Sequence, residues 1–124
     1  MSESLLRLVL TAIAAITLLS GLTQWIAPDY VLSFIAAHPD GLSLQLFATV
    51  GMFMVITGAM FLQSLRSGSY EPAIPLWIGA QKICAALLVG YGAYRGTFLP
   101  VSLGVAAFDA LSGILALLYW RRLV

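Results

Sequence analysis

The sequence predicts an all-α integral membrane protein in which a bundle of four helices crosses the bilayer. Of its 124 residues, 61% are apolar and only 9% are charged, and the mean hydropathy is +1.00. A soluble domain of this size has a large surface relative to its volume and needs more polar residues to cover it. The apolar residues also gather in four segments of about 20 residues, the length that spans a hydrocarbon core. Lipid is therefore the predicted solvent for most of the chain.

The first predicted span covers residues 5–27 and begins with a short charged region that contains Arg7. A secretory signal peptide starts in a similar way, but its apolar core is shorter and a cleavage site of small residues follows it. No such site precedes Pro28, so we expect this segment to be retained as a helix. In residues 28–41, prolines bracket the run VLSFIAA, which predicts a short helix at the membrane interface.

The other three spans are separated by shorter connections. They cover residues 42–65, 73–94 and 98–120. Short loops place neighbouring spans antiparallel, so the predicted bundle has an up-down-up-down topology within one transmembrane domain, residues 1–124. The alternation of apolar and polar residues that is typical of membrane strands does not recur along the sequence.

Basic residues near the span ends predict the orientation of the bundle, because Lys and Arg are retained on the cytoplasmic side. Four arginines fall on the side that holds the N-terminus, the second loop and the C-terminus: Arg7, Arg66, Arg121 and Arg122. The opposite side holds only Arg95. We therefore expect both termini to lie in the cytoplasm.

The composition also excludes several classes of function. A net charge of +1 with scattered basic residues argues against binding to nucleic acid. A single cysteine, Cys84, allows no disulfide within the chain, and a single histidine, His38, allows no bis-histidine haem or multi-histidine metal centre. The sequence contains no Walker A loop, HExxH motif, nucleophile elbow or Rossmann fingerprint. We predict no cofactor, no metal and no catalytic residue, although an enzyme of lipid metabolism with few polar groups remains a third hypothesis.

Two charged residues within the spans are the strongest candidates for a functional site. Lys82 lies in the third span and Asp109 in the fourth, where an ionisable group is costly unless it is paired. Lys82 precedes the Gly96-Thr97 turn by fourteen to fifteen residues, and Asp109 follows it by twelve to thirteen. In an antiparallel hairpin these positions have similar depth, so the two side chains are predicted to meet.

The helical period supports this pairing, because small residues share a face with each charge. Gly79 and Ala86 lie on the face of Lys82, and Ala106 and Gly113 lie on the face of Asp109. The pair is either a proton relay or ligand anchor, or a structural ion pair that fixes the register of the helices. The sequence does not decide between these interpretations.

A second, weaker set of polar residues lies toward the outer ends of the spans. Thr17 and Gln24 share one face of the first span, and Gln45 begins the second span at the level of Gln24. Tyr91 and Arg95 end the third span at the same level. This set predicts the rim of a cavity that opens outward and orients a lipid or quinone head group. The alternative is ordinary hydrogen bonding between helices, together with anchoring at the interface.

Features of the first two spans resemble the DoxX-like group of small four-helix bacterial membrane proteins. The resemblance covers about half of the chain, and the residues that carry it are Leu6-Arg7-Leu8, Gly21, Pro28, the Gly51–Gly58 stretch and Leu65-Arg66. The lysine that this group often carries before its loop proline is Gln24 or Trp25 here, so no role is carried over at that position. The resemblance implies that the protein lies in a bacterial cytoplasmic (inner) membrane and serves as an accessory subunit of a membrane redox system.

Two hypotheses for function follow from the sequence. The first is a non-catalytic membrane protein, which is either an accessory subunit of a larger complex or a binder of a small hydrophobic ligand. A homo-oligomer is a further possible assembly. The rival is a small proton-coupled transporter in which Asp109 changes protonation as Lys82 releases it.

Overall fold

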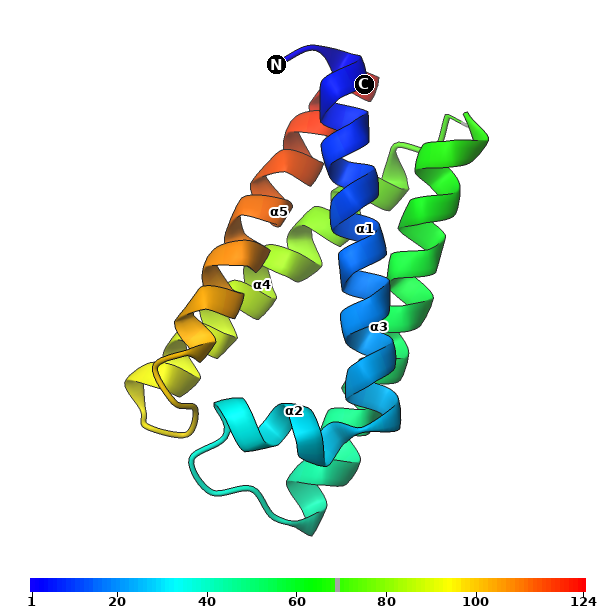
Figure 1. Ribbon diagram of the computed structural model, residues 1–124. Coiled ribbons are helices and arrows are strands. Elements are labelled where there is room, and N and C mark those ends of the chain that lie inside the picture. Colours follow the sequence, from blue (N-terminus) through cyan, green and yellow to red (C-terminus); the bar gives the residue numbers. More distant parts are fainter. Residues whose placement is uncertain (69) are drawn as a thin grey trace.

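The computed structural model describes residues 1–68 and 70–124, and in this part of the chain five helices account for nearly all of the fold (Figure 1). Four of them are long and apolar enough to cross a membrane, which confirms the predicted all-helical fold with four candidate spans. The helices are α1 (Glu3–Ile26), α2 (Pro28–Ile35), α3 (Gly41–Ser67), α4 (Ala73–Tyr94) and α5 (Ser102–Leu123).

The predicted span ends agree with the structure except at the last helix. Helix α4 begins and ends at the predicted residues, and α1 and α3 differ from their predicted spans by at most two residues at either end. The prediction that the last span begins at Phe98 is wrong, because α5 begins at Ser102. The backbone N–H of Leu99 instead donates to the carbonyl of Ile35 at 2.7 Å, and Pro100 has no N–H to continue a helix ladder. These residues connect α5 to the end of α2.

The predicted interfacial helix is present as α2, where Pro28 occupies the first turn. Proline is favoured at this position because the N–H it lacks would have no partner within the helix. The helix ends before Ala36, whose backbone is extended, so the last two residues of the apolar run lie outside it.

Helix α3 begins with a reciprocal cap between Asp40 and Ser43. The Ser43 backbone N–H donates to Asp40 Oδ1 at 2.7 Å, the Ser43 hydroxyl donates to the same oxygen, and the Asp40 N–H donates to Ser43 Oγ at 3.1 Å. The side-chain and then the backbone hydrogen bond from Ser43 hold the pKa of Asp40 below its ordinary value of 3.8. The helix ends at Ser67 and is capped by Gly68, which adopts the left-handed conformation with φ 71°.

The four long helices form two hairpins (Figure 1). Helix α1 packs along α3, and α4 packs along α5. The hairpins converge at the end of the bundle where both chain termini lie, here called the terminal end. They separate toward the opposite end, where α2 lies across the space between them; this is the loop end.

Glycines permit very close backbone packing within each hairpin. A Cβ atom added at Gly51 of α3 would lie 2.6 Å from the Trp25 backbone nitrogen and 2.8 Å from the Gly21 carbonyl oxygen of α1. In the other hairpin, a Cβ atom at Gly113 would lie 3.0 Å from the carbonyl oxygen of Gly79. The predicted small-residue face at Gly79 and Gly113 is therefore the contact between α4 and α5.

The terminal end is filled by an apolar core to which all four long helices contribute. Its buried residues are Leu6, Leu10, Ile13, Ala14, Phe61, Leu65, Ile78, Ala116 and Tyr119. Side-chain hydrogen bonds reinforce this end, since the Arg7 guanidinium donates to the Leu65 carbonyl and the Tyr70 hydroxyl donates to the Leu123 carbonyl.

At the loop end, the hairpins are joined through α2. The segment after α2 pairs with the α4–α5 loop in an isolated antiparallel bridge between Ala36 and Phe98. Backbone hydrogen bonds flank this bridge, with Ala37 N–H donating to Thr97 O at 3.1 Å and Leu99 N–H donating to Ile35 O at 2.7 Å. This connection lies at the opposite end of the bundle from the terminal core and joins the two hairpins there.

Candidate functional site

A cavity of about 640 Å³ lies between the two hairpins, bounded by the apolar core on one side and α2 on the other. Residues from all five helices line it, including Thr17 and Gln24 of α1, Val31 of α2, Met54 of α3 and Val89 of α4. Most of the lining is apolar, and eight of the twenty described lining residues have polar side chains. This volume and composition are typical of sites that hold a small organic ligand.

The predicted ion pair forms, and it lies where the cavity meets the terminal core. Lys82 Nζ donates to Asp109 Oδ1 at 3.2 Å and to Thr17 Oγ1 at 3.0 Å. The ammonium also lies 5.4 Å from the centre of the Phe108 ring, which favours a cation beside its face. Three helices therefore hold one ammonium group in place.

Burial makes this arrangement depend on the pair remaining together. The side chains of Lys82 and Asp109 are only 10% and 17% exposed, and both lie near the middle of a helix that is long and apolar enough to span a membrane. An isolated charge at such a depth is costly, whereas the pair carries no net charge. The Lys82 ammonium has three protons to donate, and Thr17 and Asp109 accept two of them.

Between the ion pair and the terminal end of the bundle, the side chains are tightly packed. A void of only about 10 Å³ remains there, lined by Thr17, Gly58, Phe61 and Gln81 among others. This is about the space of one water molecule. Lys82 and Asp109 thus mark the inner limit of the large cavity.

Gln24 forms a hydrogen bond between two helices, which was the predicted alternative to ligand binding. Its side-chain amide is buried and donates to the carbonyl of Phe47 at 2.9 Å, which ties α1 to α3. The side chain also lines the cavity near the loop end. Its amide nitrogen is already engaged, so Gln24 contributes to the wall and to the hairpin together.

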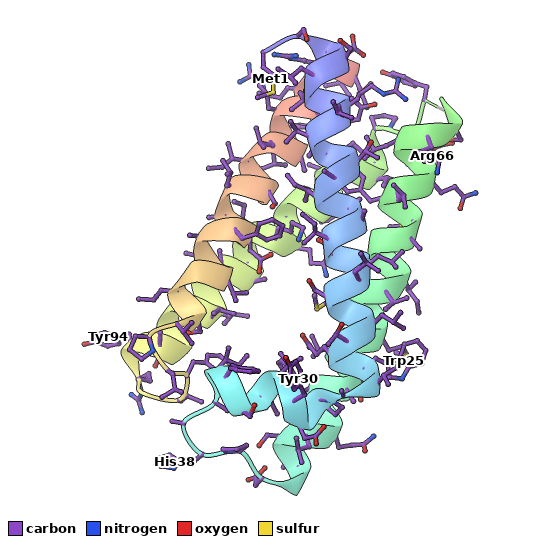
Figure 2. All side chains as sticks on the ribbon, viewed as in Figure 1. Met1, Trp25, Tyr30, His38, Arg66 and Tyr94 are labelled. Carbon is purple, nitrogen blue, oxygen red and sulfur yellow. The ribbon has the colours of Figure 1, made fainter. Side chains whose placement is uncertain are left out.

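Gln45, Tyr91 and Arg95 do not belong to the cavity lining, contrary to the predicted rim. Tyr91 follows Lys82 by nine residues, which at 100° per residue turns it to the opposite side of α4. All three are exposed on the outside of the bundle. The labelled side chains of Trp25 and Tyr94 likewise lie on the outer surface near the loop end (Figure 2). These aromatic rings suit the membrane interface.

Thr23, Gln81 and Ser102 are polar cavity residues that were not among the predicted site residues. Ser102 is 1% exposed and lines the cavity, and its hydroxyl has no hydrogen-bond partner within the described residues. Gln81 lies beside Lys82 and lines both the cavity and the small void on its terminal side. An uncharged amide in the middle of a span was a usable signal for Gln81. Ser102 offered a weaker one, because serine commonly packs between membrane helices.

The remaining candidate groups lie away from the cavity. His38 is in the exposed connection between α2 and α3 (Figure 2), and Cys84 is exposed on α4. Within residues 1–68 and 70–124, no three His, Cys, Asp or Glu side chains come close enough together to hold a metal ion. The arrangement offers hydrogen-bond donors and one buried charge pair to a molecule in the cavity.

Comparison of the chain with protein-family models, with curated proteins and with solved structures finds no match.

Proposed function

We propose that this chain is a non-catalytic, multi-pass protein of a bacterial cytoplasmic membrane that binds a small hydrophobic molecule between its two hairpins. The observation that carries the proposal is the 640 Å³ cavity with the Lys82–Asp109 pair at its inner limit. A largely apolar space with a few convergent polar groups is the usual form of a ligand site. The distribution of arginines supports an orientation with both termini in the cytoplasm.

The surroundings of the ion pair favour binding over a purely structural role. A pair that only fixes helix register is best enclosed by packed side chains, because each remaining polar atom then needs a partner. Here Lys82 and Asp109 both line a cavity large enough for an organic molecule. Their unused hydrogen-bonding capacity therefore faces a space where a ligand can reach it.

The test is native mass spectrometry of the protein released gently from its own membrane. We expect a bound small molecule in the wild-type protein and in Arg95→Met, which removes a positive charge outside the cavity. Lys82→Met, with Asp109→Leu added so that no unpaired carboxylate remains, is expected to lose that molecule. An empty wild-type protein that also binds no added lipid would refute the proposal.

The rival function is a proton-coupled transporter, and the titratable pair in the membrane is the observation that favours it. The apolar core lies at one end of the cavity and α2 at the other, so transport through the bundle would require these elements to move. Flux in liposomes with and without a pH gradient tests this function. A stoichiometric protein partner in the mass spectrum would instead support the accessory-subunit function.

A further inference from the structure

We propose that the occupant of the cavity is an uncharged lipid, taken directly from the bilayer, whose oxygen atoms reach both Lys82 and Ser102. This inference rests on the proposed function and adds the chemical class of the ligand, its route and a second anchoring residue. It is carried by the closed ends of the cavity, by the neutrality of its ion pair and by the unpartnered hydroxyl of Ser102.

Protein lies across the cavity at both ends of the bundle. Toward the terminal end, the core around Phe61 and Ile78 leaves only the void of about 10 Å³. Toward the loop end, Val31 and Ile35 of α2 form part of the lining, and the bridge between Ala36 and Phe98 fixes the end of α2 to the opposite hairpin. A molecule that arrives from water would have to displace one of these barriers.

The sides of the cavity are less protected than its ends. Ile16 of α1 and Val105 of α5 line the cavity and yet remain 47% and 44% exposed. On the other side, Val50 of α3 is 50% exposed, and Gln81 of α4 is also exposed. In a membrane these flanks face acyl chains, so a molecule dissolved in the bilayer reaches the cavity between the hairpins without crossing α2.

The charge balance selects an uncharged head group. Lys82 and Asp109 neutralise each other, and the ammonium still has donor capacity beyond Thr17 and Asp109. A ligand carbonyl or hydroxyl oxygen can accept that hydrogen bond without adding charge. A carboxylate or phosphate would leave a net negative charge at a depth where charge is costly.

Ser102 supplies a second polar position. Ser102 lines the cavity, and its buried hydroxyl has no hydrogen-bond partner among residues 1–68 and 70–124, which is costly for a buried hydroxyl. Ser102 precedes Asp109 by seven residues on α5, which places the two positions about 10 Å apart along the helix. A second oxygen at mid-chain of the lipid would satisfy Ser102 while the head oxygen lies at Lys82.

The experiment measures binding of three radiolabelled probes to the protein in phosphatidylcholine vesicles at pH 8. The probes are methyl stearate, the methyl ester of stearic acid hydroxylated at mid-chain, and the corresponding hydroxylated free acid. We expect the hydroxylated ester to bind about tenfold more tightly than methyl stearate, the effect of one buried hydrogen bond. The ionised acid is expected to bind at least tenfold more weakly than its ester.

Ser102→Ala is expected to remove the preference for the hydroxylated ester and to leave methyl stearate binding unchanged. Ser112→Ala is the matched control, because Ser112 is equally buried on α5 but donates to Phe108 O at 2.7 Å and does not line the cavity. A hydroxyl preference that survives Ser102→Ala, or tighter binding of the ionised acid, would overturn this inference while leaving the proposed function intact. Failure of every probe to bind natively folded protein would overturn the proposed function itself.

Discussion

Lys82 is the residue whose replacement tests the energetics of the cavity most directly. Lys82→Met keeps an unbranched apolar chain of similar length but removes the hydrogen bonds to Thr17 and Asp109. Hydrogen bonds between membrane helices contribute about 0.6 kcal/mol each on average. Leaving Asp109 without its cation adds about 2.5–3.5 kcal/mol at mid-membrane. We therefore expect the free energy of unfolding to fall by roughly 3–5 kcal/mol, as for other broken buried pairs.

The double variant Lys82→Met/Asp109→Leu separates the charge effect from packing. It leaves no unpaired charge, so its unfolding free energy is expected to lie within about 1 kcal/mol of the wild type. With Asp109→Leu as the fourth corner, which is expected to cost a similar amount because Lys82 is then unpaired, the cycle should give a coupling energy of about 5 kcal/mol or more. Reversible unfolding in mixed detergent micelles, followed by circular dichroism, provides the measurement. A coupling energy below about 0.5 kcal/mol would refute the reasoning, because the pair would then contribute no specific stability.

Three further predictions concern the frame around the cavity. Gly51→Ala is expected to lower the free energy of unfolding by roughly 1–3 kcal/mol, because the added methyl group meets the α1 backbone. Gly90→Ala is the control, since its Cβ position has no atom of the described residues within 4 Å, and it should be neutral or slightly stabilising. The pKa of Asp40 is lowered in the folded protein, so its carboxylate cap stabilises α3 fully above pH 3.8. This contribution is lost as the pH falls through the lower folded-state pKa of Asp40. Amide exchange at the start of α3 should speed up over this pH range in the wild type and not in Asp40→Asn. A disulfide formed by Ala36→Cys and Phe98→Cys, in a background without the native cysteine, would lock the loop end, because opposed residues in such a bridge lie at a suitable separation. The oxidised and reduced forms are expected to bind the hydroxylated ester equally, and loss of binding on oxidation would show that access requires α2 to move.

The sequence predicted the parts of the fold that depend on hydrophobic length. Lipid requires long apolar helices, and α4 therefore begins and ends where its apolar run does. The start of α5 could not be predicted in the same way, because Leu99 bonds to Ile35, a residue more than sixty positions earlier. Contacts of this kind arise from the arrangement of the hairpins and leave no periodic pattern in the sequence.

The candidate site was predicted in part for a similar reason. Lys82 and Asp109 share a depth and an inward face, both of which follow from helix geometry, so their pairing was predictable. The cavity was not, because its volume depends on how far the hairpins separate. Tyr91 shows the limit of reasoning from depth alone. It lies at the depth of the expected rim, but on the side of α4 that faces away from the cavity.

The convergence of the hairpins at one end also gives the molecule a tapered cross-section (Figure 1). The membrane leaflet at the loop end must accommodate α2 and two separated hairpins, while the leaflet at the terminal end surrounds a compact core. Lipids adjust around an inclusion at a modest elastic cost that depends on its shape. In a bilayer, a tapered shape is expected to favour curvature, so a ligand that changes the spacing of the hairpins should change the curvature that the surrounding membrane favours.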